Sequence, residues 1–290
     1  MPSEGRPKRP RSGARKGKPR KSVPPRTPFQ HIVELVRWVD LVIEVLDARL
    51  PASTRHPNAA AIFGNKPRLI VLAKEDLADR DATLASVGAV AGDIPVMMLS
   101  LKQAQGKQAV VNAVLDATRQ KQEALKRKGI LERPMRVCVV GLPNVGKSSL
   151  INWLIGKKRT RVGNRPGITQ GTQWVRVHPR LELLDTPGIL PPVEFEPGTA
   201  SRLAMLNLLP EGKYDTELVA RSSLSLMIKR YPGLMERYVE GITRSEDPLV
   251  RFAEARNLLT SGARPDLKRA ASLYLSDLRD GRIGAVTLDV

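Results

Sequence analysis

The segment Gly141-Leu142-Pro143-Asn144-Val145-Gly146-Lys147-Ser148 has the form G-x-x-x-x-G-K-[ST] of a phosphate-binding loop. Its glycines let the backbone fold around an anion without Cβ clashes. The apolar run 136–140 before it is typical of a buried parallel strand, and residues 149–155 have the pattern of a helix whose N-terminus would face the anion. Strand, loop and helix together predict an α/β nucleotide-binding fold, with Lys147 on the β- and γ-phosphates and Ser148 on Mg²⁺.

A second acidic segment follows the phosphate loop. The apolar run 181–184 ends in Asp185-Thr186-Pro187-Gly188. Because ligands of open α/β sheets bind at the carboxyl ends of strands, we expect Asp185 to hold Mg²⁺ through water and the Gly188 N–H to contact the γ-phosphate. Thr169, in the preceding loop, is expected to join the metal when a triphosphate is bound. The predicted magnesium ligands are therefore Ser148, Thr169 and Asp185, and Thr169 and Gly188 are also candidate catalytic residues.

The strands expected to complete the sheet lie upstream of the phosphate loop. After Gly188 only helical spacing is found, and three strands are too few for a doubly wound sheet. The apolar runs 41–46, 69–72 and 94–99 each end in polar residues and are separated by helical patterns. The sequence therefore predicts an α/β fold with a doubly wound, mostly parallel sheet, followed by an α-helical domain.

Two upstream segments, 73–76 and 100–102, are candidates for reading a guanine base, and we call them the base-reading segments. Ala73-Lys74-Glu75-Asp76 resembles the N-K-x-D motif of GTPases, and Ser100-Leu101-Lys102 resembles their S-A-K motif. The Asp76 carboxylate can accept hydrogen bonds from guanine N1–H and the N2 amino group, a pair of donors that adenine lacks. The Lys74 stem would lie along the base, and the Leu101 N–H would face guanine O6. The alternative is that Asp76 is an ordinary helix N-cap.

The base-reading half therefore precedes the phosphate-binding half. In this order the chain resembles the circularly permuted P-loop GTPases, most closely the bacterial ribosome biogenesis GTPase A family, over roughly residues 28–290. The matching runs are Asp47-Ala48-Arg49-Leu50-Pro51, residues 141–149, residues 165–169, Gln173-Trp174, residues 185–191, Tyr231-Pro232 and residues 277–284. The resemblance implies GTP hydrolysis coupled to late assembly of the large ribosomal subunit, and a helical domain that touches ribosomal RNA.

The same resemblance implies which residues bind GTP or GDP. They are Lys74, Asp76, Ser100, Leu101, Lys102, Asn144, Val145, Gly146, Lys147, Ser148, Ser149, Thr169 and Gly188.

Three positions depart from the GTPase pattern or have more than one interpretation. Ala73 replaces the usual Asn of N-K-x-D, which predicts weaker nucleotide affinity with retained guanine preference. Ile189 stands where signalling GTPases carry a water-positioning Gln. The family is thought to use a histidine instead, at a position that falls near Pro24 here; the nearest one, His31, is a candidate catalytic residue or an ordinary helix-surface residue. Asn144 is a candidate K⁺ ligand or a plain turn residue.

Charge divides the chain further. The net charge is +19, and residues 1–27 carry ten Lys or Arg and one acidic residue, which predicts a disordered basic tail. We expect the GTPase domain at residues 28–198 and the helical domain at 199–290. The tail and two basic clusters, residues 126–128 and residues 157–159 with Arg161 and Arg165, favour a polyanionic partner. Only 4% of the residues are aromatic, which favours contacts to phosphates rather than to bases.

The remaining expectations concern compartment and partners. One cysteine indicates a reducing, cytoplasmic compartment, and no apolar run reaches the roughly 18 residues of a membrane span. The expected partners are a large-subunit precursor and its ribosomal RNA, and the protein is expected to be monomeric off the ribosome. Two alternatives are a nucleotide-gated regulator of a protein partner and an RNA-binding scaffold whose nucleotide is only structural.

Overall fold

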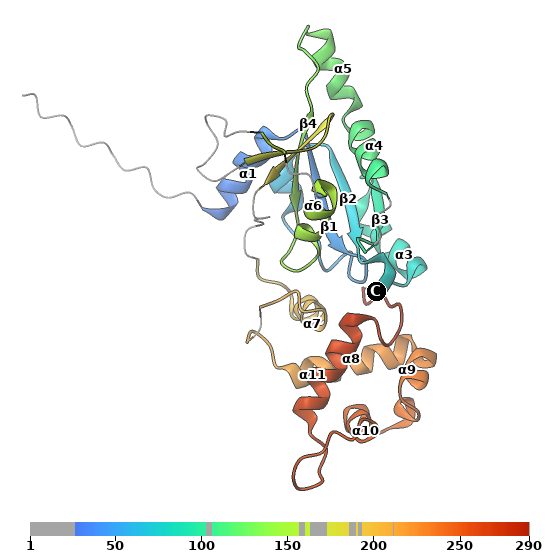
Figure 1. The fold of residues 1–290 in the computed structure, drawn as a ribbon. Helices are drawn as coiled ribbons and strands as arrows, with labels where there is room; N and C mark the ends of the chain where they lie inside the picture. The colour runs from blue at the N-terminus through green and yellow to red at the C-terminus, as the bar shows by residue number, and fades with distance from the viewer. Residues whose placement is uncertain are drawn as a thin grey trace, which may run out of the picture.

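The computed structural model describes residues 27–102, 106–156, 160–162, 173–185, 190, 193–210 and 212–289; for residues 160–162, 173 and 185 it describes the backbone alone. Within these residues the chain forms a seven-stranded sheet of order β3-β2-β1-β4-β7-β6-β5 (Figure 1). The strands are β1 Leu41–Asp47, β2 Arg68–Ala73, β3 Val96–Leu99, β4 Met135–Val140, β5 Thr160–Val162, β6 Gln173–His178 and β7 Leu181–Asp185. Neighbours from β3 to β7 are parallel, whereas β6 and β5 join antiparallel.

The strand order confirms the predicted sheet. β4, which leads into the phosphate loop, lies between β1 from the upstream half and β7 from the downstream half. The upstream strands thus extend one side of the sheet, although they come first in the chain. One strand differs from its prediction: the run expected to begin at residue 94 begins at Val96, directly after Pro95, which has no N–H to donate to a ladder.

Helices cover both faces of the sheet, as a doubly wound fold requires. In β1, alternate residues face opposite sides: Ile43 packs in the core with α4 and α6, and Val42 packs with α1 and α2. α3 covers the β1–β2 side near Leu46. The bounds are α1 Pro28–Trp38, α2 Ala59–Phe63, α3 Arg80–Ala91, α4 Lys107–Ala117, α5 Arg119–Arg127 and α6 Lys147–Ile155, with a short 3₁₀ turn η1 at Glu75–Leu77.

The elements after residue 193 form a helical region, which we define as α7–α11. Its bounds are α7 Pro197–Met205, α8 Thr216–Arg230, α9 Pro232–Tyr238, the 3₁₀ turn η2 Ile242–Arg244, α10 Pro248–Ala255 and α11 Leu267–Asp280. Aspartates cap three of these helices: Asp215, Asp247 and Asp266 accept N–H bonds from the first turns of α8, α10 and α11. Buried Phe252 and Tyr274 pack edge to face at the centre of the region.

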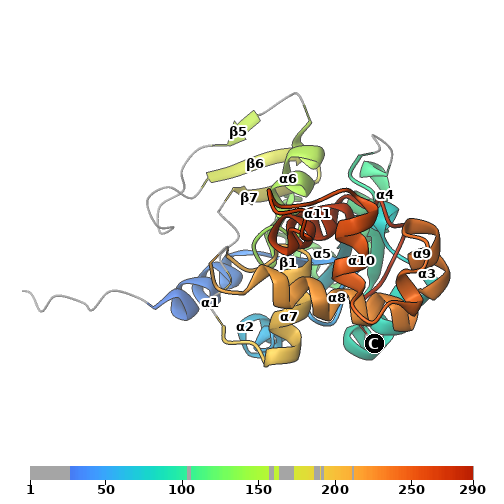
Figure 2. The same ribbon diagram turned by 90° about the horizontal axis from the view of Figure 1, so that it is seen from below.

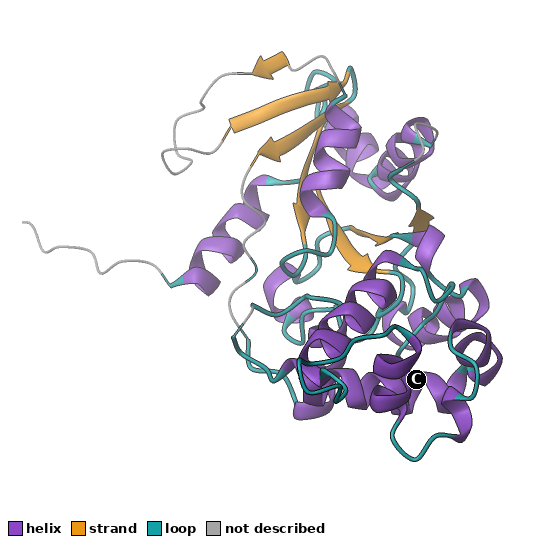
Figure 3. Cartoon of the chain, turned by 60° about the horizontal axis from the view of Figure 1, so that its bottom comes forward, coloured by secondary structure: helices purple, strands orange, loops and turns teal. Residues whose placement is uncertain are grey.

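The helical region lies at the carboxyl ends of the parallel strands (Figures 1 and 3). Seen from below in Figure 2, its helices stand in front of that edge. The chain then returns to the α/β part, because the Val286 N–H donates to Leu77 O at 3.1 Å and the Leu288 N–H donates to Arg49 O at 2.8 Å. No helix among the described residues is both long and apolar enough to cross a membrane.

Candidate nucleotide-binding site

The phosphate loop lies closely against the ends of two strands. Gly141 has φ 157°, and a Cβ there would come within 2.4 Å of the Val45 carbonyl oxygen of β1. Gly146 has φ 117°, and its Cβ would lie 3.3 Å from the Ala73 Cβ at the end of β2. Both positions need glycine, for conformation and for space. Ala73, the position that departs from N-K-x-D, therefore lies directly beside Gly146 of the phosphate loop.

The side chains of the loop differ in what they can offer a ligand. Lys147 Nζ donates to the Leu142 carbonyl at 2.6 Å, and its partial burial lowers the pKa of its ammonium group. Ser148 and Ser149 are exposed on the first turn of α6. Val145 is fully buried in the core and does not line the cavity described below.

The two base-reading segments meet at Asp76. Ser100 Oγ donates to Asp76 Oδ1 at 2.9 Å, and Lys102 Nζ lies 2.7 Å from Asp76 Oδ2. Burial raises the pKa of the Asp76 carboxyl, but the hydrogen bonds from Lys102 and Ser100 outweigh it and leave the pKa below its ordinary value. The residue that caps helix α3 is Asp79, whose side chain accepts the Ala82 N–H. Asp76 therefore is not the N-cap of that helix.

Lys74 links the base-reading half to the phosphate loop. It adopts a left-handed conformation with φ 63°, and its Nζ donates to Asp47 Oδ2 at 2.8 Å and to the Asn144 carbonyl at 3.2 Å. Asp47 is fully buried at the end of β1, where Arg49 also holds it through Nε and Nη2 at 3.0 Å each. A charged, hydrogen-bonded chain thus connects the ends of β1 and β2 with the phosphate loop.

The base-reading segments and the phosphate loop border one cavity of about 550 Å³. Of the predicted residues, Lys74, Asp76, Leu101, Lys102, Asn144, Gly146 and Ser149 line it. Ser100, Lys147 and Ser148 are not among the lining residues. Lys147 and Ser148 begin helix α6 directly after Gly146, and Ser100 donates a hydrogen bond to Asp76. The two halves of the predicted site, which lie about 70 residues apart in sequence, are therefore neighbours in the fold.

Other predicted residues lie elsewhere or outside the described part. His31 is half-buried on α1, which packs on the sheet through Ile32, Leu35 and Val36, and it is not among the residues lining the cavity. Thr169, Gly188, Ile189 and the basic tail up to residue 26 lie outside the described residues, as does the side chain of Asp185.

The cavity wall also contains residues that are not among the predicted nucleotide ligands. They are Arg49, Ala73, Leu77, Leu206, Asn207, Arg279 and Asp280. Arg49 could have been found, because it follows the carboxyl end of a predicted strand. Asn207 and Arg279 come from the helical region: no motif includes Asn207, and the matching run 277–284 that includes Arg279 does not assign it a contact with the nucleotide.

The backbone around the phosphate loop is compatible with Mg²⁺. Leu183 of β7 pairs with Val137 of β4, so Asp185 ends its strand at the same edge of the sheet as the phosphate loop. Exposed Ser148 lies on the first turn of α6 above that edge. A hydroxyl and a carboxylate are the hard oxygen ligands that Mg²⁺ prefers. Magnesium supplies charge neutralisation at the phosphates when it is bound.

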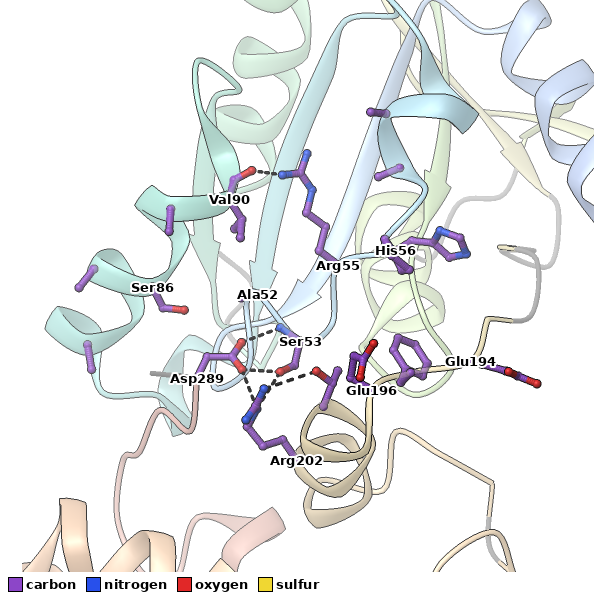
Figure 4. Close-up of a pocket in the computed structure, with 18 of the residues that line it drawn as sticks. Ala52, Ser53, Arg55, His56, Ser86, Val90, Glu194, Glu196, Arg202 and Asp289 are labelled. Atoms are coloured by element: carbon purple, nitrogen blue, oxygen red, sulfur yellow. Dashed lines mark hydrogen bonds and ion pairs between the residues drawn. The ribbon is translucent and has the colours of Figure 1, made fainter.

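A larger cavity of about 910 Å³ lies beside α2, α3 and the approach to α7 (Figure 4). None of the predicted nucleotide-binding residues lines it. At its edge the Asp289 carboxylate accepts the Ser53 N–H at 2.7 Å and lies 3.4 Å from Arg202 Nε of α7. Through these contacts Asp289 attaches the C-terminal segment and α7 to the loop that follows β1.

Asp47 gives the site a testable pH dependence. Burial raises the pKa of Asp47, but Arg49 and Lys74 more than reverse this and bring it from 3.8 to about 2. A depressed pKa stabilises the fold above the unfolded value and loses that contribution as pH falls towards 2. At pH 6 the wild type should have a higher free energy of unfolding than Asp47→Asn. We expect this difference to be smaller by about 2 kcal/mol at pH 2. Urea unfolding at each pH measures it.

The matched control for this prediction is Asp116→Asn, because Asp116 pairs with Arg119 at an exposed position. Its free-energy difference from the wild type is expected to stay nearly constant over the same range. A constant difference for Asp47→Asn as well would contradict the prediction.

Comparison with known proteins adds independent findings. A family model described as "50S ribosome-binding GTPase" matches residues 136–224, which begin at β4 and so leave out the upstream half. The chain is 36% identical over 267 residues to "Ribosome biogenesis GTPase A" of Bacillus cereus, covering 90% of this chain and 89% of the relative. It is 31% identical over 261 residues to the protein of the same name from Thermotoga maritima, again covering 90% and 89%.

Two solved structures are similar over most of the fold. A GDP-bound structure of TM YlqF has a TM-score of 0.65 at 27% identity and covers 89% of this chain and 97% of its own. A GNP-bound structure of YlqF from T. maritima has a TM-score of 0.63 at 26% identity and covers 89% and 95%. The similarity therefore spans the α/β part and the helical region together.

Proposed function

The chain belongs to the ribosome biogenesis GTPase A family, and on that premise we propose that it hydrolyses GTP in the 550 Å³ cavity while it assists late assembly of the large ribosomal subunit. The observation that carries the proposal is the meeting of the base-reading segments and the phosphate loop around one cavity. A guanine at Asp76 and phosphates at the start of α6 would then belong to a single nucleotide. Circular permutation changes the chain order of these parts and not their spatial relation.

Each part of the cavity has a chemical task in this proposal. Asp76, kept ionised by its lowered pKa, would accept the two guanine N–H groups. The phosphates would take the N–H groups of the loop and the N-terminus of α6, and Lys147 Nζ would exchange the Leu142 carbonyl for phosphate oxygens. Ser148, Thr169 and Asp185 would hold Mg²⁺, and Asn144 would help bind K⁺. The Gly188 N–H would contact the γ-phosphate.

Charge supports ribosomal RNA as the partner. The basic run Lys126-Arg127-Lys128 ends helix α5, which has no buried residue and projects beyond the sheet, away from the helical region (Figure 1). No ion pair of these three side chains is found among the described residues. By contrast, Arg221 on α8 is already held by Glu217 and Asp247. The exposed end of α5 can therefore meet phosphates without first breaking ion pairs.

Co-sedimentation with purified large-subunit precursors at rising salt tests this proposal. Binding is expected in the presence of a non-hydrolysable GTP analogue and should weaken linearly on a log–log plot of affinity against salt. Replacing Lys126, Arg127 and Lys128 by glutamine should reduce the steepness of that plot by about 2 to 3, because each lost phosphate contact removes roughly 0.7 to 0.9 of a unit. A protein partner would instead give shallow salt dependence. Absence of binding to the precursors would overturn the proposal.

A further inference from the structure

The helical region forms one wall of the candidate nucleotide cavity. Leu206, Asn207, Arg279 and Asp280 line it, opposite the phosphate loop and the base-reading segments. A nucleotide in this cavity would be enclosed by the α/β part on one side and by the helical region on the other. The contacts along this wall determine how closely those parts are tied.

Arg279, in the last turn of α11, holds the end of α7. Its Nε donates to the Met205 carbonyl at 2.9 Å and its Nη2 donates to the Ala204 carbonyl at 3.0 Å. These are carbonyls at the C-terminus of α7, where helices have unsatisfied acceptors and favour a cation. Asn207 lies two residues beyond the end of α7 and has a left-handed conformation with φ 55°. Arg279 therefore fixes where the Asn207 carbonyl points.

That carbonyl contacts the phosphate loop. Asn144 Nδ2 donates to Asn207 O at 2.9 Å, and Asn144 is itself left-handed with φ 61°. The side chain of a phosphate-loop residue is thus held by the helical region. This hydrogen bond connects the residue beyond the end of α7 directly to the loop.

The backbone of Arg279 completes a closed circuit of contacts. Its carbonyl accepts Arg49 Nη1 at 3.0 Å, across a sequence separation of 230 residues. Arg49 is only 2% exposed and is held by Asp47, which binds Lys74, whose Nζ reaches the Asn144 carbonyl. Arg49, Lys74, Asn144, Asn207 and Arg279 all line the cavity. The circuit therefore surrounds the space that the nucleotide would occupy.

We propose that Arg279 is a positioning residue for the nucleotide: by fixing the end of α7 it pre-orders the phosphate loop, so that docking of the helical region and nucleotide binding strengthen each other. The inference rests on the proposed function, since the cavity must bind GTP. A loop that is already ordered loses less conformational entropy when the ligand arrives. Coupling between two such events is reciprocal, so nucleotide must also stabilise the end of α7.

The test compares Arg279→Met with Arg282→Met in the full chain. Methionine keeps much of the apolar stem but removes every donor. Arg282 is a matched control, because it is 61% exposed and its ion pairs are to Asp277 and Asp280 near its own helix end. The affinity for GDP is expected to fall about tenfold in Arg279→Met and to stay within about twofold in Arg282→Met. Titration calorimetry measures both.

Hydrogen exchange supplies the readout that a merely structural role would not produce. In the wild type and in Arg282→Met, GDP should increase amide protection of residues 203–208, and this increase should vanish in Arg279→Met. Should Arg279→Met fail to fold, Arg279→Lys, which keeps the charge and one donor group, takes its place with a smaller loss. Unchanged affinity with an unchanged GDP-induced increase overturns the inference. A wild type that binds no GDP or GTP overturns the proposed function instead.

Discussion

Replacing Lys147 by alanine is expected to slow GTP hydrolysis at saturating GTP by about a hundredfold to a thousandfold, the loss typical of one pre-positioned group that stabilises transition-state charge. The ammonium group lies within the loop on the Leu142 carbonyl, at 2.6 Å. It therefore needs only a short movement to reach phosphates cradled by the same loop. Partial burial lowers the pKa of Lys147 because it disfavours the charged form, and the negative phosphates would favour that form again.

Single-turnover hydrolysis of GTP, with and without ribosomal subunits, measures this effect. Lys268→Ala is the matched control, because Lys268 is an exposed lysine on α11 and its loss changes the net charge equally. The control should hydrolyse GTP at the wild-type rate. If Lys147→Ala kept a rate within about threefold of the wild type, Lys147 would have no role at the phosphates.

The phosphate loop and the base-reading half could be predicted because their signals are local. The glycines of the loop encode its conformation: Gly141 has no room for a Cβ beside the Val45 carbonyl, and Gly146 has a positive φ that other residues rarely adopt. The polar residues after β1, β2 and β3 follow strands whose carboxyl ends meet at one edge of the sheet. Local rules therefore brought Asp76 and the phosphate loop to the same cavity.

Residues that depend on distant contacts could not be predicted in the same way. The Arg49 side chain donates to the Arg279 carbonyl across 230 positions, and neither residue type nor spacing predicts that contact. Helix α9 begins at Pro232, separated from the end of α8 by one residue, and is only 7 residues long. Strand β5 has 3 residues. Both elements are too short to give a periodic pattern. Sequence position alone places the C-terminal segment in the helical domain, yet the backbone N–H groups of Val286 and Leu288 donate hydrogen bonds to the α/β part.

Guanine recognition leads to the second large effect, which we expect from Asp76→Asn. An asparagine offers one acceptor and one donor where the carboxylate offers two acceptors, so its amide N–H would face a guanine N–H. Loss of hydrogen bonds to a charged group predicts about a hundredfold lower affinity for GTP. Xanthosine triphosphate has a carbonyl in place of the guanine amino group, which the new amide can donate to. Its affinity should therefore rise, and the preference between the two nucleotides should reverse.

Competition binding of the two triphosphates to Asp76→Asn measures the reversal, and Asp79→Asn is the control three residues away. Asp79 caps α3 through an oxygen that asparagine retains, so this variant should fold and keep the wild-type preference for GTP. A loss of affinity for both nucleotides alike in Asp76→Asn would show a disturbed fold rather than altered base reading. Because Ser100 and Lys102 both hold this carboxylate, a preference for GTP that survived the substitution would mean that the β2 and β3 ends do not read the base.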